Sequence, residues 1–211
     1  MLTPTEDFFS YLSRMNFLAH IYLSGNNDEL KIGNFIADGI VGNKYKHLPI
    51  TVQKGIKLHR KIDSFTDTHP IVRKSKKRLH PRYRHYNGVI IDILYDHYLA
   101  KNWSKYSDIE LNTYAQQFYT LLTDNHEILP EKIKKLLPYM IKDNWLYNYR
   151  TIEGIETVLI GMNKRTKNIS KMNLAIEDLQ LYYTDFEDDF TTFFEDLRNL
   201  SSEQTKIILN K

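Results

Sequence analysis

The chain contains no cysteine among its 211 residues, which excludes disulfide bonds, thiol nucleophiles and thiolate metal sites. Only His, Asp, Glu and Asn remain as protein ligands for a metal. Glycine and proline are also scarce, with 8 and 6 residues, and this favours long helices with short connections over an all-β fold. No apolar run approaches the ~18 residues that a membrane span needs. The opening MLTPTEDFFSYLSR is acidic and does not resemble a secretion signal, so we expect a soluble cytoplasmic protein.

The length is typical of one domain, which can bury a full core without a structural metal. Any bound metal is therefore free to serve catalysis. Apolar residues recur at helical spacing through most of the chain, and no alternating strand pattern of useful length occurs. We predict an all-α, single-domain helical bundle. The predicted helices are 5–13, 15–24, 28–41, 50–66, 70–79, 84–103, 108–127, 131–143, 151–165, 172–198 and 202–209.

Three helix starts are predicted from capping signals. Ser107 and Glu110 have the spacing of a capping box, in which both side chains satisfy free backbone N–H groups. Pro49 and Pro130 suit the entry to the helices that follow them.

Charge is distributed unevenly, although the net charge is only +3. Residues 73–84, RKSKKRLHPRYR, hold seven Lys or Arg and no acid, whereas residues 177–197 hold eight acids and no base. A solvated helix face explains such runs about as well as a binding surface does. If the basic run binds, its partner is acidic, either a protein or a nucleic acid.

Two helices carry carboxylates and imidazoles in a repeated pattern. His59 and Asp63 are four residues apart and project from one helix face, and Asp92 and Asp96 repeat this spacing. The second pair lies in GVIIDILYDHYLA, whose apolar residues predict a mostly buried helix. A buried carboxylate without a partner is very costly. Asp92 and Asp96 must therefore meet cations, hydrogen-bond donors or a metal.

His20 and Asp38 are likewise single polar groups among apolar neighbours, in MNFLAHIYL and KIGNFIADGIVG. Any one such residue is more often a core residue satisfied by hydrogen bonds. Several of them confined to residues 20–97 favour a shared site. Imidazoles with carboxylates and no sulfur suit Mn²⁺, Mg²⁺, Fe²⁺ or Zn²⁺, and such an ion activates water and stabilises charge on phosphoryl oxygens. The predicted chemistry is hydrolysis at phosphorus.

Arg60 follows His59 and has the fork geometry that clamps a phosphate. One residue along a helix is a rotation of about 100°, so the two side chains need not face the same way. A surface arginine or an ion pair with a nearby aspartate explains Arg60 equally well.

Four blocks of the sequence together resemble the acyl carrier protein phosphodiesterase family. They are MNFLAHIYLS (15–24), GNFIADGIVG (33–42), GIKLHRKIDSFTDTHP (55–70) and DILYDHYLAKNW (92–103), with a later Gly161-Met162 pair. The resemblance covers roughly residues 15 to 200. It implies an all-helical fold related to the HD phosphohydrolases and a divalent metal, typically manganese. The implied reaction is hydrolysis of holo-acyl carrier protein to the apo form and 4'-phosphopantetheine.

The resemblance also carries functional positions onto this chain. They are His20, Asp38, His59, Asp63, Asp92, Asp96 and His97. All but His97 are expected among the metal ligands, and His59 or His97 is expected to transfer a proton, with Asp63 and Arg60 assisting catalysis. The chain departs from ordinary HD enzymes, because Arg60 rather than an aspartate follows His59, and the adjacent pair is Asp96 then His97. Residues 1–14 are predicted to be an extension before a domain spanning 15–211, because family members begin at the equivalent of Met15.

Acyl carrier proteins are acidic, so the basic run is predicted to dock the substrate. The predicted docking residues are Arg73, Lys74, Lys77, Arg78, Arg82 and Arg84. The metal-type residues argue against a noncatalytic partner that only binds the carrier protein, and two other interpretations remain at this point. One is a metal phosphohydrolase of the HD type that acts on a nucleotide. The other is a helical nucleic-acid-binding module that uses residues 73–84 without catalysis, although it leaves the buried His and Asp residues unexplained.

Overall fold

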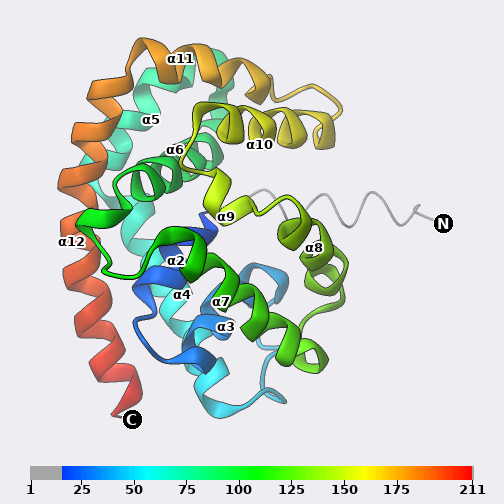
Figure 1. Ribbon diagram of the computed structural model, residues 1–211. Coiled ribbons are helices and arrows are strands. Elements are labelled where there is room, and N and C mark those ends of the chain that lie inside the picture. The colour runs from blue at the N-terminus through cyan, green and yellow to red at the C-terminus, as the bar shows by residue number, and fades with distance from the viewer. Residues whose placement is uncertain (1–15, 211) are drawn as a thin grey trace.

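The computed structural model describes residues 16–210, which form α-helices joined by short connections (Figure 1). No strand occurs in that range, so the all-α prediction is confirmed. No helix in that range is both long and apolar enough to cross a bilayer. The helix predicted at 5–13 and the proposed extension 1–14 lie outside the described residues.

The helices are α2 (Phe17–Leu23), α3 (Asp28–Ile36), α4 (Ile50–Thr68), α5 (Pro70–Tyr83), α6 (Asn87–Lys101), α7 (Leu111–Asp124), α8 (Glu131–Lys142), α9 (Trp145–Asn148), α10 (Ile152–Arg165), α11 (Ala175–Leu181) and α12 (Tyr183–Leu209).

The long helix α12 forms one side of the bundle and packs against α4, α5 and α6 (Figure 1). Its buried stripe includes Phe186, Phe190, Phe193 and Phe194, which recur at the spacing of one helix face. These rings join a continuous apolar core that also includes residues of α2, α4 and α6. The core therefore fixes α12 against the helices that carry the predicted site.

Helices α3 and α4 approach each other through two glycines. A methyl group at Gly33 would lie 2.0 Å from the Val52 carbonyl oxygen, and one at Gly55 would lie 2.4 Å from the Leu30 carbonyl oxygen. Neither distance is possible for a real side chain, so only glycine permits this contact. The close approach positions the end of α3 and the 3-10 turn Ala37–Gly39 beside the middle of α4.

The acidic C-terminal region differs from the prediction. The predicted helix 172–198 is interrupted at Tyr182, where α11 ends and α12 begins. No glycine or proline marks this break. The separately predicted helix 202–209 is the last part of α12, which continues without a break from Tyr183 to Leu209.

The start of α7 was predicted incorrectly. The helix begins at Leu111, and the Glu110 carboxylate caps it by accepting a hydrogen bond of 2.9 Å from the Thr113 N–H. Ser107 accepts from the Ile109 N–H and caps no helix. Pro49 and Pro130 lie at the N-cap positions of α4 and α8, as predicted.

The basic run forms most of α5, and it faces the acidic run of α11 and α12. Lys74 Nζ lies 2.8 Å from Asp189 Oδ1, and Arg78 Nη1 lies 2.5 Å from Asp189 Oδ2. Arg82 Nη1 lies 2.8 Å from Glu177 Oε2. The two oppositely charged runs therefore neutralise each other within the chain.

This pairing changes the docking prediction. Lys74, Arg78 and Arg82 have acidic partners inside the chain, which leaves them poorly suited to bind an acidic surface. Arg73, Lys77 and Arg84 are exposed, and within residues 16–210 they form no ion pair. For these three residues, docking stays a prediction.

Candidate functional site

Two imidazoles and a carboxylate meet inside the bundle. His20 comes from α2, and His59 and Asp63 come from one face of α4; their potential ligand atoms all lie within 4.8 Å of one another. Asp63 Oδ1 lies 3.2 Å from His20 Nε2, and Asp63 Oδ2 lies 3.1 Å from His59 Nε2. The two rings stack with their centroids 4.1 Å apart. Asp38, from the turn after α3, joins the cluster through Oδ1, which lies 3.1 Å from His59 Nε2.

The buried side chain of Asn34 orients both rings. Its Oδ1 lies 2.7 Å from His20 Nδ1 and 3.2 Å from His59 Nδ1, and its backbone oxygen lies 2.9 Å from His59 Nδ1. The amide nitrogen donates to the His20 carbonyl and the Ser24 hydroxyl, which fixes Oδ1 as the acceptor. Both histidines therefore carry a proton on Nδ1 and direct Nε2 toward Asp63. Ligand histidines in metalloproteins are oriented in this way.

Asn34 was not predicted as a site residue, because an amide is a less common ligand type than an imidazole or carboxylate. The sequence nevertheless contains a signal that could have identified Asn34. Asn34 lies four residues before Asp38 in a strongly apolar segment, so the two residues share one face of a continuing helix.

The cluster is strongly coupled electrostatically. Burial disfavours the charged form of His59, but hydrogen bonds to Asp38 and Asp63 outweigh burial and raise the pKa of His59 to about 10. Burial likewise opposes the ionised form of Asp63, but His20 and His59 hold the pKa of this carboxyl well below its usual range. Without a metal, a protonated His59 thus supplies the positive charge between two carboxylates. A divalent cation would supply the same charge.

The residues present fit a divalent metal. His20 Nε2 is buried and makes no well-formed hydrogen bond, although Asp63 Oδ1 is near, so its lone pair is available to a cation. His20, His59 and Asp63 provide two nitrogen ligands and a carboxylate without sulfur, which suits Mn²⁺, Fe²⁺ or Zn²⁺. Three protein ligands leave positions open for water and substrate.

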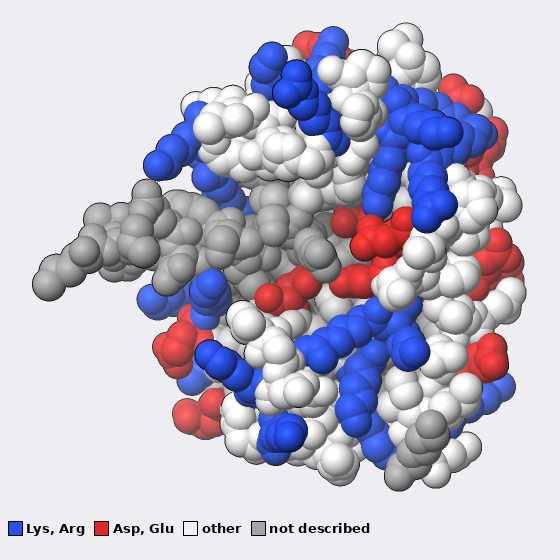
Figure 2. All heavy atoms as spheres, turned by 180° about the vertical axis from the view of Figure 1, so that it is seen from behind, with Lys and Arg blue, Asp and Glu red and all other residues white. Residues whose placement is uncertain are grey.

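Asp92 joins the site from α6. It lines a cleft of about 370 Å³ together with Asp63, Asp67, Lys76 and His85. Burial and then the neighbouring Asp63 raise the pKa of Asp92 well above its usual range. Figure 2 shows acidic side chains gathered in a hollow of one face, with Lys and Arg on either side of them. Asp92 and Asp63 therefore face the same solvent-accessible cleft.

The structure does not bring Asp96 into the cluster. Its two carboxylate oxygens accept hydrogen bonds of 2.9 Å from the Leu18 and Ala19 N–H groups, so the side chain caps the first turn of α2. Burial raises the pKa of Asp96 to about 8, although these two bonds act in the opposite direction. Asp96 thus positions the helix that carries His20, and the metal role predicted for it is not supported.

His97 and Arg60 also lie apart from the cluster. His97 Nδ1 donates to the Tyr149 carbonyl, and Nε2 is 2.9 Å from the Tyr183 hydroxyl, so both nitrogens are occupied in the core. Arg60 Nη2 donates to the Gly42 carbonyl at 2.6 Å, and the guanidinium lies over the Tyr45 ring. The predicted proton transfer by His97 and phosphate clamp by Arg60 are therefore not supported by this arrangement.

Substitutions of Asp96 distinguish a helix-capping role from a metal-binding role. We expect Asp96→Ala to lower the free energy of unfolding by about 2–4 kcal/mol, because two buried N–H groups lose their acceptor. Asp96→Asn keeps one acceptor oxygen and should cost clearly less, with Mn²⁺ affinity close to that of the wild type. Urea unfolding and calorimetric titration with Mn²⁺ measure the two quantities. A stable Asp96→Asn protein that no longer binds Mn²⁺ would make Asp96 a ligand after all.

Comparison with known proteins shows which family the chain matches. The family model described as acyl carrier protein phosphodiesterase matches residues 15–197, which include the whole His and Asp cluster. The chain belongs to the acyl carrier protein phosphodiesterase family. A phosphodiesterase of this name from Photorhabdus laumondii is 32% identical over 181 residues, covering 85% of this chain and 91% of the relative. One from Pectobacterium atrosepticum is 30% identical over 191 residues, covering 90% of this chain and 99% of the relative.

A third acyl carrier protein phosphodiesterase, from Yersinia pestis, is 30% identical and covers 85% of this chain and 94% of the relative. No solved structure matches the chain. Membership places the chain in a family of phosphoric diester hydrolases, as the resemblance of the four blocks predicted. The relationship of acyl carrier protein phosphodiesterases to HD enzymes stays a prediction.

Proposed function

We propose that this protein hydrolyses the phosphodiester of holo-acyl carrier protein, releasing 4'-phosphopantetheine and the apo carrier, with a divalent metal bound by His20, His59 and Asp63. The observation that carries the proposal is the buried cluster of two imidazoles and a carboxylate beside a cleft, in a chain of this family. Manganese is the metal that we test first, because the resemblance implies it.

Each residue of the cluster has a definable task. A bound divalent ion would supply Lewis acidity toward a phosphoryl oxygen and lower the pKa of a bound water. His20 and His59 would hold it through Nε2, in the orientation that Asn34 imposes, and Asp63 would supply an oxygen ligand. Asp38 contacts His59 and restrains its ring from the side of α3.

The cleft provides the remaining group that the reaction needs. The departing serine oxygen of the carrier must receive a proton. Asp92 faces the cleft beside Asp63, and burial and the negative charge of Asp63 raise its pKa, which favours the protonated form that a proton donor needs. We therefore assign the proton donor to Asp92 in place of His97, whose nitrogens are both occupied in the core.

The reaction is tested directly by mass spectrometry. Holo-acyl carrier protein incubated with the protein and Mn²⁺ should lose the mass of 4'-phosphopantetheine, and free nucleotides offered in parallel should be untouched. EDTA should reduce turnover to background, and added Mn²⁺ should restore it. An intact carrier in the presence of bound metal would refute the substrate, whereas turnover that survives exhaustive chelation would refute the metal.

The nucleic-acid alternative loses its main support. It depended on residues 73–84 as a free basic surface, but Lys74, Arg78 and Arg82 of that run are paired with acids of α11 and α12. The exposed bases that remain on α5 are too few to form a basic stripe.

A further inference from the structure

A second basic surface lies on α4, beside the site. A shallow groove of about 580 Å³ runs between α4 and the last turns of α12. Its lining includes Lys54, Lys57, Arg60 and Lys61 together with Ile50 and Ile207. We call this surface the α4 groove.

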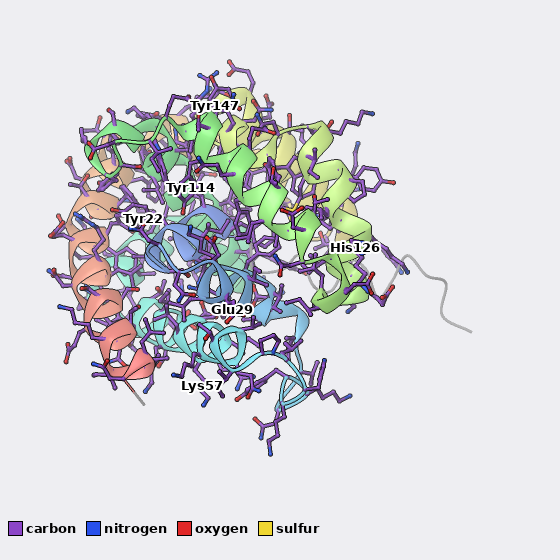
Figure 3. The ribbon with its side chains drawn as sticks, turned by 60° about the horizontal axis from the view of Figure 1, so that its bottom comes forward. Tyr22, Glu29, Lys57, Tyr114, His126 and Tyr147 are labelled. Atoms are coloured by element: carbon purple, nitrogen blue, oxygen red, sulfur yellow. The ribbon has the colours of Figure 1, made fainter. Side chains whose placement is uncertain are left out.

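The positive charges of the α4 groove are not neutralised within the chain. Among the residues that the structure describes, none of its four bases forms an ion pair. Lys54 donates only to the Leu209 carbonyl, at 3.4 Å, and Arg60 donates to that of Gly42. Lys57 and Lys61 are exposed, and Figure 3 shows Lys57 on the outer side of α4. Lys74 and Arg78 of α5, in contrast, pair with Asp189 of α12.

Apolar side chains accompany these charges. Ile50 is 64% exposed and Ile207 is 40% exposed, although isoleucine is usually buried. Exposed apolar residues with a polar rim are typical of a protein interaction site. A matching partner would present a helix with acidic and apolar side chains, because a groove of this kind binds the face of an amphipathic helix.

The position of the α4 groove suits the chemistry. In a holo carrier the scissile phosphodiester is attached directly to a serine at the start of an acidic helix, so that helix must come close to the catalytic cleft. Arg60, which lines the groove, is three residues before Asp63, so the two residues are neighbours on the surface of α4. Figure 2 shows Lys and Arg grouped next to the acidic hollow on the side where α12 ends.

We propose that the α4 groove is the docking surface for the acidic helix of the carrier protein, in place of the basic run on α5. The proposal rests on the proposed function for the identity of the partner. Its bases would attract the acidic helix electrostatically, while Ile50 and Ile207 contact apolar residues of that helix. The serine at the start of the helix would then reach the cleft that Asp63 and Asp92 line.

Binding of apo carrier tests the surface without requiring hydrolysis. We compare the wild type with three double variants of equal charge change. They are Lys57→Glu/Lys61→Glu in the α4 groove, Arg73→Glu/Lys77→Glu on α5, and Lys135→Glu/Lys142→Glu on α8 as the matched control. Fluorescence anisotropy gives the Kd for labelled apo carrier, turnover of holo carrier gives KM, and circular dichroism verifies folding.

We expect the α4 double variant to raise Kd and KM by about tenfold or more, because like charges then face each other. The α8 variant should bind as the wild type does, and added salt should weaken wild-type binding but have little effect on the α4 variant. Unchanged Kd in the folded α4 variant, or a loss confined to the α5 variant, would overturn the docking proposal while leaving hydrolysis intact. A wild type that binds apo carrier through α4 but does not cleave the holo form would instead overturn the proposed function. A wild type that neither binds nor cleaves carrier would overturn both.

Discussion

Replacing Asp63 by asparagine should lower kcat/KM for holo carrier by about 10²–10³-fold, comparable to the loss of one preorganised electrostatic contact in other enzymes. Asp63 supplies the carboxylate that both imidazoles contact, with its oxygens 3.2 Å from His20 Nε2 and 3.1 Å from His59 Nε2. Asparagine has the same shape but no charge, so the proposed metal would lose its anionic ligand. Steady-state turnover with saturating Mn²⁺, together with a Mn²⁺ titration, measures both effects.

The same variant changes how stability depends on pH in the metal-free protein. The pKa of His59 is raised from 6.5 to about 10 by Asp38 and Asp63 against the effect of burial. This group binds its proton more tightly in the folded state, so its contribution to stability is fully present below pH 6.5 and is lost as the pH rises through about 10. Asp63→Asn should flatten this decline in urea unfolding between these two pH values.

Asp67 provides the control on the same helix. Its carboxylate is exposed and pairs with Lys76 Nζ at 3.0 Å, without contact to either histidine of the cluster. Asp67→Asn should therefore change kcat/KM only slightly. Equal losses in the two variants would mean that general acidity of the cleft, rather than the cluster, supports the reaction.

Replacing Gly55 by alanine should destabilise the fold by about 3 kcal/mol, at the upper end of the usual cost of overpacking. The added methyl group would lie 2.4 Å from the Leu30 carbonyl oxygen and 2.8 Å from the Asn34 nitrogen, so α3 and α4 must move apart. That movement separates Asn34 and Asp38 from His59. We therefore expect Mn²⁺ affinity to fall together with stability.

Gly161 is the matched control, because it lies in helix α10 with no atom within 4 Å of an added methyl group. Gly161→Ala should be neutral or stabilise by about 0.5–1 kcal/mol, as expected for alanine in a helix interior. Chemical denaturation of both variants makes the comparison. If Gly55→Ala unfolds at the same urea concentration as the wild type, the two helices cannot be in the close contact described above.

Sequence reasoning identified the cluster because helical spacing and the family blocks both pointed to it. His59 and Asp63 are four residues apart and do share one face of α4, and His20 and Asp38 meet them. The same spacing rule did not predict the surroundings of Asp92 and Asp96 on α6, because nearly every residue of that helix from Ile90 onward is buried. Spacing shows which residues share a face, but it does not show which helix that face contacts. Asp92 faces the cleft, whereas Asp96 faces the start of α2.

The charged runs also show that the sequence alone does not reveal which segments contact each other. Their signs and positions were clear from the sequence, but the acidic partner expected for the basic run was another molecule. Lys74 and Arg78 instead meet an acid of the same chain, because α12 packs along α5 and buries Asp189 between them. Only the three-dimensional arrangement distinguishes a base with an internal partner from a base that is free to bind another molecule.

The single amide of Asn34 has a consequence for how the site would release a bound metal. Because one side chain sets the proton position on both imidazoles, their two lone pairs cannot be redirected independently. Asn34 belongs to α3, so local opening of that helix would disorganise both nitrogen ligands in one event. Release of a bound ion and the detachment of α3 from α4 would thus be thermodynamically linked, and such an ion would slow amide hydrogen exchange throughout α3.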